Sequence, residues 1–297
     1  MNKKKTLLII LILTLIVVLS SCELLMKKPP KPNVKVMVVA LDYAHDNEIK
    51  LDGTIRDAKE FKQALAELNP NIPDSSFVEM YQEGPAPDEN DPKYPTPNNV
   101  LTEIGKQLED LNENDLFIFY YAGHGVDYVG DLALATSNED DLYEPLSVKT
   151  LLEKFSNIKK GHAVLILDSC YSGQYVPSYD FFDDYYNPNL LVIAASSPDK
   201  KSYEGDFPIS GDPNHRHGFF TYSFLEALGW DHSGGKLEEN VAGIITQVRG
   251  ELKTSPVMYN GTITFSSIFR YIRKHNGTKR PFIVRGPIDK VLYSEKW

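Results

Sequence analysis

Cysteine is scarce in this sequence: the 297 residues contain two, Cys22 and Cys170. That number excludes the disulfide scaffolds that small exported domains build from several cysteine pairs. If Cys22 carries another modification, as argued below, no intrachain disulfide can form and Cys170 is left alone. A lone thiol calls for an explanation either by burial or by reactivity.

Positive charge is also scarce. The chain has 31 Lys and Arg against 41 Asp and Glu, which gives a formal net charge of −10, and its hydrophobic content is 42%. Proteins that bind nucleic acid normally present a clustered basic face, so we expect no nucleic-acid partner. The hydrophobic fraction is ordinary for a globular domain and argues against an extended or disordered chain.

A long apolar run occurs at the N-terminus. Three lysines precede the run from Leu7 to Leu19, in which Thr14 is the single polar residue. The run is too short for the ~20 apolar residues of a membrane-spanning helix, and a basic start before such a run is typical of an export signal. Residues 1–21 are therefore predicted to be a signal peptide.

The end of this run, Leu19-Ser20-Ser21-Cys22, resembles a bacterial lipobox, in which small residues precede a cysteine that is lipidated. The resemblance implies a lipid on Cys22, a tether over residues 22–33 and an exported lipoprotein anchored to a membrane of the cell envelope. The alternative is an uncleaved N-terminal anchor. Without residues 1–21 the chain keeps 28 basic and 41 acidic side chains, a net charge of −13, so the anchor rather than the surface should hold it at anionic lipid.

From Val34 onward, short apolar runs alternate with amphipathic segments, which predicts an α/β fold with a mostly parallel central sheet and helices on both faces. Strands are predicted over 36–41, 77–81, 116–121, 163–167 and 190–195, and helices over 54–68, 98–111, 147–155, 219–228 and 237–252. We assign residues 34–260 to this domain. Residues 261–297 have weaker patterning and are treated as a C-terminal extension of unknown role.

Two predicted strands run into residues that carry chemistry. The strand over 116–121 continues into Gly123-His124-Gly125, and the strand over 163–167 continues into Asp168-Ser169-Cys170. Ligands of an open parallel sheet bind beyond the carboxyl ends of its strands, so we expect His124 and Cys170 in one site. A thiol is mostly protonated at neutral pH and needs a base, which His124 can provide. The backbone N–H groups of Gly125 and Cys170 are candidates for an oxyanion hole.

Together these elements resemble the caspase and metacaspase superfamily of cysteine peptidases. His124 stands 46 residues before Cys170, and further matches are Asp52-Gly53-Thr54, Asp57-Ala58, Ala194-Ala195-Ser196 and Gly218-Phe219-Phe220-Thr221. The resemblance implies a caspase-like three-layer sandwich and an endopeptidase with a Cys170–His124 dyad. It also implies a peptide or protein substrate and no required cofactor.

Substrate preference follows from two acidic positions. In metacaspases two aspartates line the pocket for a basic P1 residue, and the matching positions here are Asp57 and Asp168. Paired carboxylates favour Arg or Lys and exclude Asp. The structural alternatives are that Asp168 holds the turn and that Asp57 is a first-turn helix acid. Calcium activates many metacaspases, but Asp140 and Asp141 precede the position of the family's acidic pair, so calcium activation is left open.

A different class of function also stays open: a chain that has kept the fold but lost turnover, and that binds a protein partner. Cys170 would then be an inert buried thiol. The histidines other than His124 are interpreted as surface or loop residues: His45, His162, His215, His217, His232 and His275. The pair His215 and His217 is too few ligands for a metal ion without others, so no metal site is predicted.

Overall fold

The computed structural model describes residues 31–69, 72–84, 91–126, 129–136, 142–176, 185, 187–237, 257–259, 262–276, 283–286 and 289–294. The predicted signal peptide, Cys22, Asp140, Asp141 and all but the first residue of the predicted helix over 237–252 lie outside these ranges. Within them, no helix has the length and apolar character needed to cross a membrane. Pro32–Glu295 form one compact unit, which is described below.

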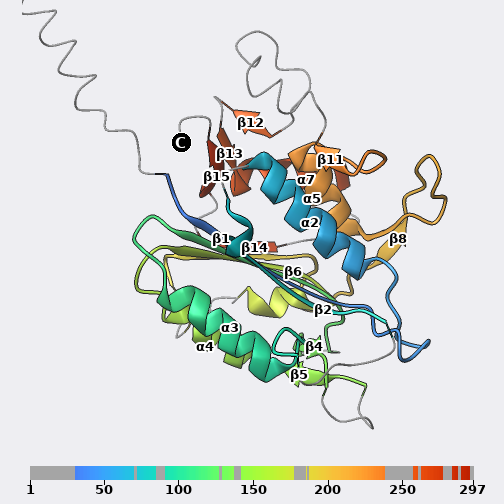
Figure 1. Cartoon of the computed structure of the whole chain (residues 1–297), viewed down its shortest axis with the longest axis horizontal. Helices are drawn as coiled ribbons and strands as arrows, with labels where there is room; N and C mark the ends of the chain where they lie inside the picture. Colours follow the sequence, from blue (N-terminus) through green and yellow to red (C-terminus); the bar gives the residue numbers. More distant parts are fainter. Residues whose placement is uncertain are drawn as a thin grey trace, which may run out of the picture. The chain divides into compact units, whose positions relative to one another are not determined.

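A six-stranded sheet runs through the middle of this unit (Figure 1). In spatial order its strands are β14 (Ile283–Arg285), β7 (Leu190–Ala194), β6 (His162–Asp168), β3 (Leu116–Ala122), β1 (Val34–Leu41) and β2 (Phe77–Gln82). All neighbours are parallel except β14, which pairs antiparallel with β7. Every residue of β3 is buried, as expected for a central strand covered on both faces.

Helices cover both faces of the sheet (Figure 1). Helices α2 (Thr54–Leu68), α5 (Phe219–Leu228) and α7 (Phe265–Asn276) lie on one face, and α3 (Pro97–Glu109) and α4 (Val148–Ser156) lie on the other. Alternate residues of β1 divide between the two cores: Val36 and Val38 face α2, whereas Met37 and Val39 face the opposite core. The predicted three-layer α/β fold with a mostly parallel sheet is confirmed.

The helix starts follow from local sequence. Thr96 caps α3 by accepting a hydrogen bond from Asn99 N at 3.3 Å, and Pro97 occupies the first helical turn. Ser147 caps α4 in the same way through Thr150 N at 3.1 Å. The predicted bounds of α2 and α5 are confirmed, while the other predicted elements that lie within the described residues differ from the structure by one or two residues at their ends.

Short strands were not predicted. They pair as β4 (Leu132–Leu134) with β5 (Glu144–Leu146), β8 (Glu204–Asp206) with β9 (Arg216–Gly218), β10 (Trp230–Asp231) with β11 (Lys236–Leu237), and β13 (Thr262–Thr264) with both β12 (Met258–Tyr259) and β15 (Val291–Ser294). Two 3₁₀ turns, η1 (Asp74–Ser76) and η2 (Ser172–Tyr175), complete the described elements. Leu237 lies in β11, so the helix expected from that residue does not begin there.

The expected boundary at residue 260 does not mark the end of the packed unit. Strand β14 extends the central sheet through β7. Phe265, Ile268 and Ile272 of α7 are buried in the same core as α5, together with Leu292. These apolar residues have helical spacing and polar or basic residues occupy positions between them, so the sequence does carry an amphipathic helix pattern that the prediction missed.

Candidate functional site

The site begins with the register of two central strands. Ala122 at the end of β3 lies opposite Asp168 at the end of β6. Two residues further along each chain segment stand His124 and Cys170, and both line one pocket of about 100 Å³. The neighbouring pair β3 and β1 is where the strand order of the sheet reverses, the place at which open α/β sheets bind ligands. The structure therefore brings the two predicted residues to one pocket.

The turns after these strands are tightly constrained. A methyl group on Gly125 would lie 1.9 Å from Cys170 O, so only glycine allows this approach of the two segments. Tyr171, directly after Cys170, has φ of 57° although it is not glycine. Non-glycine residues in the left-handed region cost about 1–3 kcal/mol and concentrate at functional sites. The predicted oxyanion residues Gly125 and Cys170 thus lie against each other in a strained turn.

Two buried tyrosines hold the main chain of His124. His124 N donates to Tyr43 Oη at 2.9 Å, and Tyr43 Oη donates to Ala133 O at 2.6 Å. Tyr121 Oη donates to His124 O at 2.8 Å. Burial raises the pKa of both tyrosines, so both hydroxyls keep their protons. Tyr43 is the second non-glycine residue with positive φ, at 52°, among the described residues. Sequence reasoning missed this support, because nothing in the chain order marks either tyrosine.

The His124 ring is oriented by a backbone carbonyl. Nε2 lies 2.5 Å from Ile49 O, and because a carbonyl oxygen can only accept, Nε2 carries the hydrogen. In a neutral ring Nδ1 is then the nitrogen with a free lone pair. The Cys170 thiol donates to Ser202 O at 3.5 Å. The arrangement offers a thiol and an unprotonated imidazole nitrogen in the same pocket.

Asp168 lines this pocket and is buried, with 7% of its surface exposed. Its Oδ2 accepts from Thr221 N at 3.2 Å and from Thr221 Oγ1 at 2.7 Å, and its Oδ1 accepts from Ser202 Oγ at 2.9 Å. Thr221 lies in the first turn of α5, whose N-terminus favours negative charge. Burial nevertheless raises the pKa of Asp168, against the lowering effect of these hydrogen bonds.

Asp57 lines the same pocket from the first turn of α2 and is 1% exposed. Its Oδ2 accepts from Gly218 N at 2.8 Å, and its Oδ1 lies 2.6 Å from His217 Nδ1. Burial raises the pKa of Asp57 well above its usual value, and the nearby Asp168 adds to the effect. A methyl group on Gly218 would lie 2.3 Å from Asp168 Oδ2 and 3.1 Å from Asp57 Oδ2, so glycine keeps the space between the carboxylates open.

A third carboxylate in the pocket, Glu204, escaped sequence reasoning. Its side chain accepts from Gly53 N at 2.9 Å and pairs with Arg216 Nε at 2.8 Å. The positive charge of Arg216 therefore balances the negative charge of Glu204. By contrast, Asp168 accepts hydrogen bonds from uncharged donors of Thr221 and Ser202. A short β-hairpin with no apolar alternation positions Glu204, and such a hairpin leaves little signal in the sequence.

Three histidines that were expected at the surface or in loops are buried, which corrects that prediction. His215, His217 and His232 are 5%, 0% and 9% exposed. Burial, together with the neighbouring His232 and His215, lowers the pKa of His217 to about 2, so the ring is neutral. The spacing of His215 and His217 places both on one side of an extended segment, but their burial depends on α2 and α5 packing over them.

Comparisons with known proteins identify the family and the fold of this chain. A family model described as Peptidase C14, caspase domain, matches residues 33–292. Among solved structures, the crystal structure of protein GSU0716 from Geobacter sulfurreducens is similar in fold, with a TM-score of 0.50 and 15% sequence identity, covering 89% of this chain and 97% of that one. The comparison with curated proteins gave no significant match. The match to the family model covers most of the chain, from β1 into β15, so the chain belongs to the caspase domain family.

Proposed function

We propose that this protein is a cysteine endopeptidase in which Cys170 is the nucleophile, His124 transfers the protons, and the pocket prefers Arg or Lys at P1. The observation that carries the proposal is the shared pocket, in which the residues after β3 and β6 meet. Membership of the caspase domain family supports cysteine peptidase chemistry.

The proton transfers follow from the orientation of His124. Nδ1 accepts the thiol proton of Cys170, and the thiolate attacks the carbonyl carbon of the scissile peptide bond. The imidazolium returns this proton to the leaving amine as the C–N bond breaks and a thioester remains. Water then hydrolyses the thioester with His124 as base, which restores the thiol. Ile49 O keeps the proton of Nε2 in place, so that Nδ1 is the base in each step.

The oxyanion of the tetrahedral intermediate needs donors next to the sulfur. We assign the N–H groups of Gly125 and Cys170 to this role, because the two segments lie in contact at this turn. The positive φ of Tyr171 supports the assignment, since a strained turn of this kind fixes the backbone before substrate arrives.

Charge favours a basic P1 residue. Asp57 and Asp168 face each other across Gly218, and Glu204 lines the same pocket. An entering guanidinium or ammonium group relieves the repulsion between buried carboxylates, whereas an entering carboxylate adds to it. Asp168 has uncharged hydrogen-bond donors as partners, so a substrate cation supplies the opposite charge that it lacks.

The test is covalent labelling of the full chain by a peptidyl acyloxymethyl ketone with Arg at P1, beside a twin probe with Asp at P1. The wild-type chain and Cys22→Ser should be labelled by the Arg probe, and Cys170→Ala should not. Labelling by the Asp probe in preference would overturn the pocket assignment. No labelling by either probe, with or without calcium, would refute peptidase activity and favour a binding role for the pocket.

The N-terminal segment is part of the proposal. We infer that Cys22 is lipidated and holds the catalytic unit at a membrane of the cell envelope, on the basis of the lipobox resemblance. Metabolic incorporation of an alkyne-bearing fatty acid tests this directly. Wild type should take up the label, Cys22→Ser should not, and Cys170→Ala should behave as wild type.

A further inference from the structure

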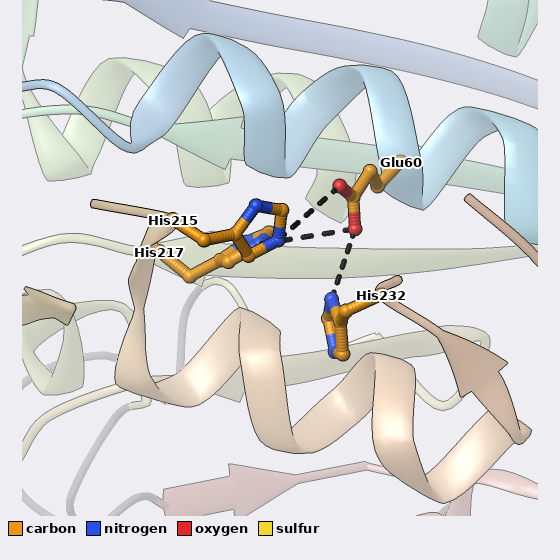
Figure 2. A group of neighbouring side chains, drawn as sticks. All are labelled: Glu60, His215, His217 and His232. Carbon is orange, nitrogen blue, oxygen red and sulfur yellow. Dashed lines mark hydrogen bonds and ion pairs between the residues drawn. The ribbon is translucent and has the colours of Figure 1, made fainter. Parts of the chain in front are cut away.

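Figure 2 shows a cluster of side chains of metal-ligating types. The cluster lies beside the pocket, because His217 contacts the pocket residue Asp57. Glu60 lies in α2 and His217 lies in β9. His215 directly precedes β9, and His232 directly follows β10. One potential ligand atom from each of the four lies within 4.8 Å of the others. Three imidazoles and one carboxylate, all largely buried, form a donor set unlike that of an exposed acidic cluster.

Hydrogen bonds fix which nitrogens of the rings face one another. His217 Nδ1 lies 2.6 Å from Asp57 Oδ1, and His215 Nδ1 lies 3.2 Å from Asp212 Oδ2. With Asp57 and Asp212 ionised, their oxygens accept, so each Nδ1 carries the hydrogen and each Nε2 presents a lone pair. These two Nε2 atoms lie 2.7 Å apart. Lone pairs at this distance repel unless a proton or a metal cation lies between them.

The carboxylate completes the set. Glu60 Oε1 lies 3.8 Å from His215 Nε2, and Glu60 Oε2 lies 3.8 Å from His217 Nε2 and 3.1 Å from His232 Nδ1. Ligands at about 2.0 Å from a tetrahedral zinc ion lie about 3.3 Å from one another, within the spread of these distances. A zinc ion would require the two Nε2 atoms to separate by roughly 0.6 Å and the ligand atoms that lie 3.8 Å or more apart to move closer. It would also replace the proton between His232 Nδ1 and Glu60 Oε2.

Outer contacts hold the rings and the carboxylate in place. Trp230 Nε1 donates to Glu60 Oε2 at 2.6 Å. His232 stacks on Tyr222 with ring centroids 4.1 Å apart and planes 7° apart. Asp57 and Asp212 bind the far nitrogens of His217 and His215, which is the carboxylate–histidine–metal pattern found around zinc ligands.

From this geometry we propose that Glu60, His215, His217 and His232 bind a zinc ion. Three imidazole nitrogens favour zinc over calcium and magnesium, which prefer oxygen ligands. Four protein ligands close the coordination shell, so the ion would be structural and would join α2 to the hairpins that contain β9 and β10.

The site would also position a pocket residue. His217 would bind the ion through Nε2 while its Nδ1 donates to Asp57 Oδ1, so the ion would fix the ring and thereby the Asp57 carboxylate. This second part rests on the proposed function, in which Asp57 binds the P1 side chain. If it holds, removing the ion should raise the KM for substrates with Arg at P1 more than it lowers kcat.

Metal binding is measured in the full chain carrying Cys170→Ala, so that zinc bound by the proposed dyad thiol does not contribute. The protein is stripped with EDTA and titrated with Zn²⁺ against a chromophoric chelator. We expect about one tightly bound ion per chain, an intense visible absorption of the Co²⁺ form, and a higher melting temperature with metal.

Variants assign the ligands. Glu60→Gln and His232→Ala should weaken Zn²⁺ binding at least tenfold, Asp212→Asn should weaken it by about 10-fold to 100-fold, and the exposed His45→Ala should bind as the parent. A parent chain that binds no ion, or whose Co²⁺ form lacks tetrahedral absorption, would overturn the zinc site. Either result is obtained with the parent chain, so the test does not depend on whether a ligand variant folds. It would also leave the peptidase proposal untouched, since labelling of Cys170 is measured separately.

Discussion

Two histidines of this molecule are held in opposite ways. The backbone N–H and C=O of His124 are both fixed by tyrosine hydroxyls, and its ring has a single described hydrogen-bond partner, Ile49 O. His217 is fully buried, and both of its ring nitrogens have close partners. A side chain that transfers protons needs a rigid backbone and a ring nitrogen open to the pocket. A metal ligand needs a rigid ring instead.

The largest effect is expected from removing the His124 side chain. His124→Ala should lower kcat/KM on an Arg substrate by about 10³-fold or more, because Cys170 loses its base. The chain should still bind Zn²⁺ as the parent does. Activity is measured with a fluorogenic peptide, with His45→Ala as the matched control. Activity within tenfold of wild type would remove His124 from the mechanism.

The next effect comes from the turn at which the segments of His124 and Cys170 meet. Gly125→Ala should lower kcat about 10²-fold, because the added methyl displaces the Cys170 backbone and with it the proposed oxyanion donors. A methyl group on the half-buried Gly84 would meet no atom within 4 Å, so Gly84→Ala controls for the loss of a glycine without a clash. Pre-steady-state acylation separates the chemical step from binding. An unchanged acylation rate would show that this turn does not contribute to catalysis.

A third prediction concerns the charge of the pocket. The pKa of Asp168 is raised, so the carboxyl is protonated below it and ionises as pH rises through it, above the ordinary range near about 4. The preference for Arg over the uncharged isostere citrulline should therefore increase with pH, by roughly tenfold. Taking the ratio of kcat/KM values cancels the titration of the dyad. Asp168→Asn should give a smaller rise, because Asp57 lines the same pocket and its pKa is also raised by burial. A flat ratio in wild type would contradict the role of these carboxylates.

The smallest effect tests the tyrosine support of His124. Tyr43→Phe leaves His124 N–H and Ala133 O without this partner and should cost about 1–3 kcal/mol of unfolding free energy. It should lower kcat by roughly threefold to tenfold through looser positioning of the ring. Urea unfolding measures the free energy of unfolding, and steady-state kinetics measure kcat. Tyr81→Phe removes a hydroxyl bonded to Glu79 near the surface and serves as the control. Equal loss in both variants would refute a positioning role.

Sequence patterns predicted the fold well, because the sheet and its covering helices depend on periodicity. Helix α2 was predicted to the residue, since its apolar face repeats every three or four positions. The pocket was visible because His124 and Cys170 follow apolar strands directly. Helix α7 was missed although Phe265, Ile268 and Ile272 have the helical spacing of an amphipathic helix.

The remaining features depend on tertiary contacts. Glu60 lies 155 residues before His215, and nothing in its local sequence distinguishes it from other acids of an amphipathic helix. Glu204 is placed in the pocket by a hairpin of three-residue strands. Tyr43 supports His124 only because β1 and β3 are neighbours in the sheet. Such residues are found by proximity in space and not by pattern.

The antiparallel pairing of β14 with β7 has a practical consequence. A strand at the edge of a sheet offers unpaired backbone groups to other chains and promotes aggregation. A version of the protein that stopped at Asn260 would uncover β7 in this way and would also lose the α7 residues from the core. Shortened forms for crystallisation should therefore extend to Glu295. Insolubility of chains cut near residue 260 would reflect an uncovered β7 and not a defect of the proposed dyad, His124 and Cys170.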